Sequence, residues 1–138
     1  MDKALNYLAL AKKGRLIELG EEPVGAITRA VKGRLVIVAS DASDHTWRRA
    51  KSFVAGTDQQ CLRVPFSKEE LGFVVGRTSR AIAAFTDAAM ALAFVKALPD
   101  QEKVKEVRET LDAKSRKLRQ RKDEAKAHER NVRLGKKK

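Results

Sequence analysis

The amino-acid sequence predicts an α/β protein: a three-layer α/β/α sandwich with a mixed central sheet, followed by a C-terminal basic helical extension. Short apolar runs alternate with helix patterns through residues 1–98, as in a sheet that helices cover on both faces. Leu35–Ala39 is apolar without a break, which is typical of a strand buried on both sides. Residues 99–138 consist mainly of good helix formers and contain too few apolar residues for a core of their own.

The first two helices are predicted from apolar spacing and from their stop signals. Leu5 and Leu8 follow helical spacing until Gly14 ends the pattern. A second helix is expected over residues 21–31, because Pro23 suits a first helical turn and Lys32-Gly33 provides a stop. Its expected apolar face consists of Val24, Ile27 and Val31.

The next two helices are predicted from residues that cap helix N-termini. A helix over residues 45–55 follows three side chains with cap oxygens, namely Asp41, Ser43 and Asp44. Ser67 and Glu70 have the spacing of a capping box, in which the two residues satisfy each other's backbone N–H groups. The helix that they open is expected to end at Gly76 in a left-handed conformation.

The strands are predicted from short runs of apolar and β-branched residues. They cover residues 35–39, 60–64 and 81–85, and residues 15–19 form a further short extended segment. Asp87 is expected to cap a helix over residues 88–97.

A long helix is expected from Asp100 to about Val132, because nothing in this stretch breaks a helix. One seam recurs every seven residues and is apolar: Val104, Leu111, Leu118, Ala125 and Val132. The companion seam is apolar only once: Val107, Lys114, Arg121 and His128. Since a coiled coil needs both seams apolar, we expect a single helix that packs its first turns on the domain and then projects. The free protein is accordingly expected to be a monomer.

The charge distribution indicates a polyanionic partner. The formal net charge is +12; residues 1–98 contribute +5 and residues 99–138 contribute +7. From Lys114 onward there are 12 basic residues and three acidic ones. Such a surplus attracts phosphates through long-range steering and counterion release, so we expect nucleic acid ahead of a membrane surface or a merely solvated face.

No motif nominates a catalytic, metal or cofactor site. Cys61 stands alone beside a strand, which is typical of packing rather than of a nucleophile. His45 follows two aspartates, but the spacing fits neither zinc nor calcium, and helix capping explains the aspartates. Trp47 is expected to lie in the core or to be half-buried, with Arg48, Arg49 and Lys51 as ordinary helix surface. We therefore expect no enzyme activity, no cofactor and no metal.

The sequence contains no signal for secretion or membrane insertion. Met1–Leu5 begins a helix pattern without the features of a signal peptide, and no run reaches the roughly 18 apolar residues of a membrane span. We expect a cytoplasmic protein.

Three segments together resemble a known family: residues 20–24 ahead of a helix, Leu35–Ser43 (LVIVASDAS) and Lys68–Arg77 (KEELGFVVGR). In this order the chain is similar to the L-seven-Ae / L-thirty-e / S-twelve-e / Gadd-forty-five family of ribosomal proteins, and most of all to its bacterial YlxQ-like branch. The resemblance covers roughly residues 4–98. It implies that residues 1–98 form a domain of the kink-turn-binding type, with residues 99–138 as a basic tail.

The resemblance also implies where RNA binds. In this family the start of the second helix enters the groove beside tandem sheared G·A pairs, and a later loop contacts the extruded nucleotides. The corresponding residues of the first element are Gly20, Glu21, Glu22, Val24, Gly25 and Arg29, and those of the second are Gly76, Arg77, Thr78, Ser79 and Arg80. The basic tail adds Arg116, Lys117, Arg119, Arg121 and Lys122. The expected partner is structured RNA, above all ribosomal RNA, and with it the ribosome.

One segment departs from the family pattern. The usual reading motif is Asn-Glu-Val-Thr-Lys, whereas this chain has Glu22-Pro23-Val24-Gly25-Ala26. The change predicts weaker reading of a kink-turn, with affinity supplied by the tail or with a different RNA as the partner. The alternative function is a protein-interaction module on the same fold, whose basic tail docks on an acidic partner.

Overall fold

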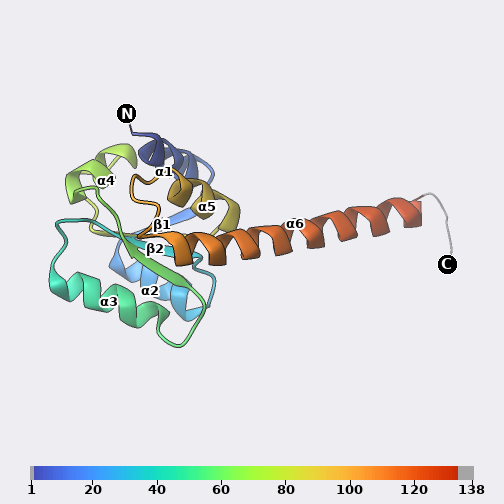
Figure 1. Ribbon diagram of the computed structural model, residues 1–138, viewed down its shortest axis with the longest axis horizontal. Coiled ribbons are helices and arrows are strands. Elements are labelled where there is room, and N and C mark those ends of the chain that lie inside the picture. Colours follow the sequence, from blue (N-terminus) through green and yellow to red (C-terminus); the bar gives the residue numbers. More distant parts are fainter. Residues whose placement is uncertain (1, 134–138) are drawn as a thin grey trace.

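A four-stranded mixed sheet forms the middle layer of the protein (Figure 1). The computed structural model describes residues 2–133. The strands are β1 (Ile17–Leu19), β2 (Leu35–Val38), β3 (Gln60–Arg63) and β4 (Ile82–Phe85), in the order β1-β4-β2-β3. β4 runs antiparallel to both of its neighbours, while β2 and β3 are parallel. The predicted strands and the mixed sheet are therefore confirmed.

Helices cover both faces of the sheet, as predicted for a three-layer sandwich. They are α1 (Lys3–Lys13), α2 (Glu21–Arg29), α3 (Asp44–Val54), α4 (Lys68–Val74), α5 (Ala88–Lys96) and α6 (Lys105–Arg133). α1, α4 and α5 pack together on one face, and α2 and α3 lie on the other (Figure 1). α6 packs on α5 and β3 before it leaves the domain. None of the helices between residues 2 and 133 is long and apolar enough to cross a membrane.

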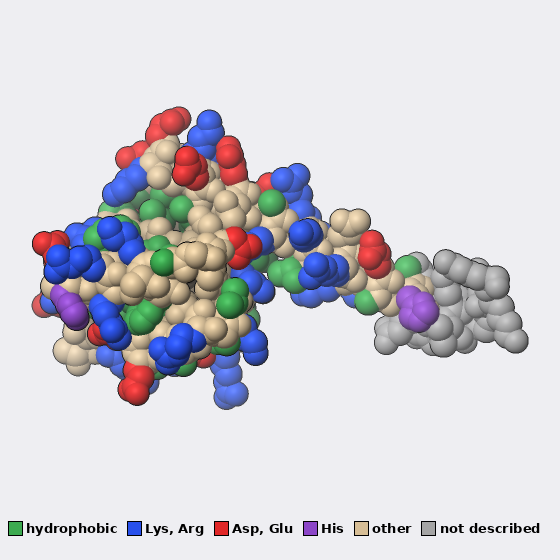
Figure 2. Space-filling model, turned by 90° about the horizontal axis from the view of Figure 1, so that it is seen from below, with side chains coloured by type: hydrophobic (Ala, Val, Ile, Leu, Met, Phe, Trp, Pro, Cys, Tyr) green, Lys and Arg blue, Asp and Glu red, His purple; other side chains and the backbone are tan. Residues whose placement is uncertain are grey.

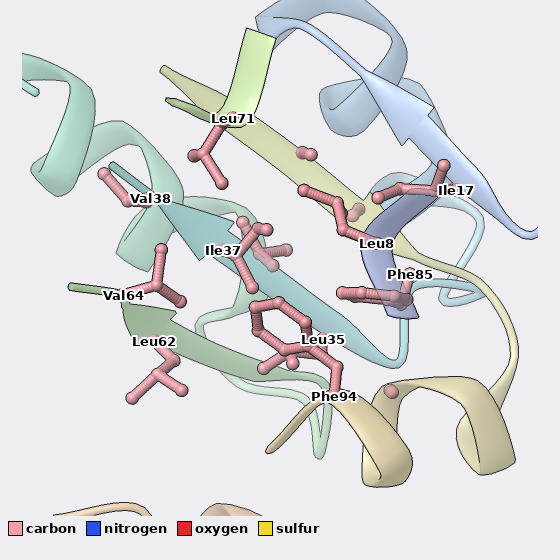
Figure 3. Packing of buried hydrophobic residues seen from close by; sticks show 14 of the residues in the cluster. Leu8, Ile17, Leu35, Ile37, Val38, Leu62, Val64, Leu71, Phe85 and Phe94 are labelled. Atoms are coloured by element: carbon pink, nitrogen blue, oxygen red, sulfur yellow. The ribbon is translucent and has the colours of Figure 1, made fainter. Parts of the chain in front are cut away.

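The core occupies both faces of the sheet: most of its large side chains come from the sheet and the α1–α4–α5 layer (Figure 3), and Val24 of α2 and Ala50 of α3 belong to the same cluster. All four residues of β2 are buried, which agrees with the unbroken apolar run in the sequence. The rings of Phe85 and Phe94 pack with their centroids 5.1 Å apart. Burying large side chains of this kind is the main source of stability in a domain of this size.

Of the three residues expected to cap α3, Ser43 is the cap, whereas Asp44 is the first residue of the helix and Asp41 lies outside it. Ser43 accepts a hydrogen bond from the backbone of α3, and Ser67 and Glu70 form the full capping box of α4. Asp41, expected among the caps of α3, instead accepts a hydrogen bond from the backbone N–H of Lys68, at 2.9 Å. The loop after β2 thus holds the start of α4, a contact across 27 residues that local spacing does not encode.

The second helix ends earlier than its apolar spacing predicts. α2 stops at Arg29, and Val31 adopts a left-handed backbone with φ 55°. The Val31 side chain is 49% exposed, so it lies outside the apolar face that the sequence assigned to it.

The long C-terminal helix begins at Lys105 rather than at residue 100. The Gln101 side-chain amide donates hydrogen bonds to the carbonyls of Val95 and Leu98, which closes the end of α5 and turns the chain back. Val104 and Leu111 are buried, and the helix then extends away from the domain (Figure 1). The predicted arrangement, a packed root and a projecting remainder, is confirmed.

Candidate functional site

The start of α2 and the loop after α4 lie at the same end of the sheet, where β1, β2 and β3 end and β4 begins. The backbone N–H of Gly20, just before α2, donates to the carbonyl of Ile82, just after the loop, at 3.1 Å. Gly20 has φ 95°, a conformation that favours glycine. Two of the three predicted segments are therefore neighbours.

A hollow of about 310 Å³ opens beside the start of α2. It is lined by four of the predicted residues together with two residues of α3: Glu21, Glu22, Gly25, Arg29, Arg49 and Phe53. The Glu21 carboxylate is ion-paired with Arg49, so a cation balances one of the two carboxylates that line the hollow. Sequence reasoning placed Arg49 on ordinary surface and missed this role, since the two residues lie 28 positions apart.

Because Gly25 has no side chain, Arg29 and Phe53 can lie close to the backbone of α2. A Cβ atom at this position would lie 3.2 Å from the Phe53 ring and 3.3 Å from a guanidinium nitrogen of Arg29. The Arg29 guanidinium therefore lies against Gly25, one helical turn toward the start of α2. The Arg49 guanidinium lies over the Phe53 ring, 5.1 Å from its centroid, so two guanidinium groups are held near this helix start.

Val24 has a different role from its neighbours. Its side chain is fully buried, so it packs in the core and holds α2 in place. It is a positioning residue, because its side chain does not reach the surface where the other members of this segment lie.

The loop from Gly76 to Arg80 is held rigidly against α4. Gly76 has φ 73°, the left-handed conformation expected from the sequence. The N–H of Arg77 donates to the carbonyl of Gly72 at 2.8 Å, and the N–H of Arg80 to that of Lys68 at 2.9 Å. Arg77, Thr78 and Ser79 are exposed. The Nε atom of Arg80 is buried without a hydrogen-bond partner among the described residues.

An apolar hollow of about 710 Å³ adjoins this loop. Its lining includes Leu5, Val74, Arg77 and Phe73, and the Phe73 side chain is 77% exposed. An exposed aromatic ring offers a face on which a base can stack. The sequence predicts that Phe73 lies in a helix, but not that its side chain faces solvent, because this exposure depends on how α4 packs on the domain.

The basic residues of the tail lie apart from this end of the sheet. Lys114 forms an ion pair with Asp58 at 3.0 Å. Asp58 comes just before β3 and so lies at the opposite end of the strands. From there α6 projects outward, carrying Arg116, Lys117, Arg119, Arg121 and Lys122, all exposed. Seen from the side of α2 and α3, basic side chains dominate this projection (Figure 2). The third predicted segment is thus separated from the other two.

Trp47 and the residues considered for a metal site were the other candidates in the sequence. Trp47 is half-buried as expected, with Lys51 and Arg63 over its ring at 5.6 and 5.2 Å from the centroid. Residues 2–133 contain no cluster of His, Cys, Asp and Glu that could hold a metal ion.

Cys61 is expected to react slowly in the folded protein. Burial raises the pKa of its thiol to about 11 from an ordinary value of 9.0. Because only the thiolate is nucleophilic, alkylation by iodoacetamide at pH 8 should be on the order of 100-fold slower than in the urea-unfolded chain, and should accelerate as pH rises. Equal rates in the two states would contradict this burial.

The chain is similar to proteins of known sequence and structure. Over 75 residues, 54% of this chain, it is 32% identical to the RNA-binding protein YlxQ of Enterococcus faecium and covers 72% of that protein. A protein of unknown function from Bacillus halodurans is 28% identical, with a TM-score of 0.64 over 70% of this chain and 97% of that one. The 15.5 kD RNA-binding protein of Giardia lamblia, 19% identical, has a TM-score of 0.54 over 76% of this chain and 87% of that one.

No family model matches the sequence. The curated relative exceeds 30% identity over more than two thirds of its own length, and the solved structures have the L-seven-Ae-like fold that the sequence predicted. The chain therefore belongs to the YlxQ family.

Proposed function

We propose that this chain binds structured RNA, of a kink-turn-like or ribosomal kind, and catalyses no reaction. The observation that carries the proposal is that the start of α2 and the loop after α4 lie at the same end of the sheet, where the N–H of Gly20 donates to the carbonyl of Ile82, the first residue of β4. These are the two segments through which the resembled family binds RNA. The names of the Enterococcus and Giardia relatives support RNA as the ligand, and the net charge of +12 suits a polyanion.

The start of α2 is suited to hydrogen-bond acceptors on RNA. No side chain caps this helix, and the N–H groups of Glu21 and Glu22 have no acceptor among the described residues. Free N–H groups at a helix N-terminus attract phosphate and base acceptors. Pro23 removes one further donor, which weakens this element relative to the family motif.

Two guanidinium groups supply cations where the family motif has a lysine. Ala26 stands at the lysine position, but the Arg29 guanidinium lies one turn nearer the helix start, against Gly25. Arg49 lines the same hollow. Because arginine forms bidentate contacts with guanine edges and phosphates, we propose that Arg29 takes over the part of the missing lysine.

The loop offers a second set of donors. Arg77, Thr78 and Ser79 are exposed on a backbone fixed to α4. The Arg80 Nε lacks an acceptor among the described residues, and a buried donor without a partner is costly. The Arg80 guanidinium must turn outward before an RNA oxygen can satisfy this donor.

Changing Arg77→Ala together with Arg80→Ala should weaken RNA binding by about 1–3 kcal/mol if either side chain contacts a base edge. The melting temperature should change little, since surface substitutions usually cost under about 0.5 kcal/mol. The measurement is a titration of a hairpin RNA with tandem sheared G·A pairs.

The matched control is Lys12→Ala with Lys13→Ala, which removes the same charge at the far end of α1. Full affinity in the folded arginine variant would remove this loop from the binding site. A natural protein that binds an acidic polypeptide but not this RNA would favour the protein-interaction alternative.

A further inference from the structure

A groove between α1, α5 and α6 lies on the domain where the tail begins to project. Its volume is about 350 Å³, and its polar lining consists of Lys3, Tyr7, Lys96, Ser115 and Arg119. The loop after α4 lies at one end of the sheet, and the tail projects from the domain near the opposite end of the sheet. An RNA that contacts both regions must cross the surface between them.

The groove collects positive charge that the described part of the protein does not neutralise. Lys3, Lys96 and Arg119 come from three different helices, and none forms an ion pair with a described residue. No Asp or Glu is among the described residues that line the groove. Like charges repel when they converge without a counterion, so this arrangement favours an anionic ligand.

The other lining groups suit a phosphodiester backbone. The hydroxyl of Tyr7, a half-buried residue, forms no hydrogen bond with any described residue and is left to contact a ligand, whereas Ser115 lines the groove but is only 6% exposed. The floor is made of alanines of α5 and its end, spaced four residues apart: Ala89, Ala93 and Ala97. Such small side chains leave room for a chain lying along the groove.

The groove is continuous with the tail. Lys3 and Tyr7, four residues apart, line it from one face of α1, whereas Leu5, which lines the hollow beside Arg77, lies on the other side of that helix. On α6, Arg119 begins a row that continues outward with Lys122 and Lys126, at helical spacings of three and four residues. The cations of the groove therefore continue along the tail.

We infer that this groove holds the phosphate backbone of the bound RNA and leads it onto the projecting part of α6. The inference rests on the proposed function and adds a second contact region, with Lys3, Lys96 and Arg119 as phosphate-binding residues. The row of cations without carboxylates, over a floor of alanine, favours a regular polyanion over an acidic polypeptide, which usually also needs apolar anchors.

The test compares two full-length variants that lose the same charge. One carries Lys3→Gln, Lys96→Gln and Arg119→Gln; the control carries Lys12→Gln, Lys32→Gln and Lys103→Gln, at exposed positions that do not line the groove. Affinity for the hairpin RNA is measured over a range of salt concentrations. If three phosphate contacts are lost, the slope of log affinity against log salt should fall by about 2–3 in the groove variant and by much less in the control.

A second variant keeps the cations. Ala93→Glu places a carboxylate on the half-buried floor of the groove and should weaken RNA binding, whereas Ala93→Gln should weaken it less. Equal slopes for groove and control variants, or no effect of Ala93→Glu in a folded protein, would overturn the inference while RNA binding by the natural protein still supported the proposed function. Failure of the natural protein to bind the RNA would overturn both.

Discussion

Replacing Leu111 by alanine should lower the free energy of unfolding by about 2–5 kcal/mol, although Leu111 belongs to the basic tail. Its side chain is 0% exposed and joins the main core. Removing three methyl or methylene groups from a closed site costs their transfer free energy and leaves a cavity. Urea denaturation, with an unchanged dependence on urea concentration, measures the loss.

The matched control is Leu118→Ala, one heptad further along α6, where the side chain is half-buried. It should cost clearly less, because less apolar surface is removed from contact with the domain. Similar small effects for both variants would mean that the root of α6 does not pack on the domain in solution. Since Val104 is also buried, the tail's part in RNA binding is better tested by charge substitutions than by truncation after Leu98.

Gly72→Ala should destabilise the protein by roughly 1–3 kcal/mol or more and displace the loop that carries Arg77. A Cβ atom at Gly72 would lie 2.5 Å from the Cα atom and 2.7 Å from the backbone nitrogen of Ser79. These are backbone atoms of a segment hydrogen-bonded to α4, so the clash is relieved only when the loop moves. Thermal unfolding and RNA affinity should therefore both decline.

Gly14→Ala is the control for this substitution. Gly14 has right-handed backbone angles, and its Cβ would lie at an ordinary 3.4 Å from Leu16, so the change should be nearly neutral. A Gly72→Ala protein with natural stability and natural RNA affinity would show that the loop is not held against α4 as described.

Local patterns in the sequence were enough to predict the elements and the fold class. The capping box of Ser67 and Glu70 and the left-handed Gly76 are formed by residues within a few positions of one another. The unbroken apolar run of β2 and the heptad seam of α6 are likewise read from spacing alone. Such features depend on helix and strand periodicity and on cap chemistry, which adjacent residues determine.

The order of three segments in the sequence also identified the family. The sequence did not predict where α2 ends and where α6 begins, because side chains from elsewhere decide these limits. Gln101 closes α5 and so delays the start of α6. The buried amide of Gln59 accepts a hydrogen bond from the N–H of Gly33 and donates to the carbonyl of Thr28, just where α2 ends.

Only the tertiary structure decided how the candidate surfaces are composed. Glu21 of α2 pairs with Arg49 of α3. Gly72 of α4 lies close to Ser79 because the loop after α4 folds back on this helix. The groove unites α1, α5 and α6, although Lys3 and Arg119 lie near opposite ends of the sequence. Which side chains meet across such distances depends on the packing of whole elements around a shared core, and this is a property of the assembled layers rather than of any local run of residues.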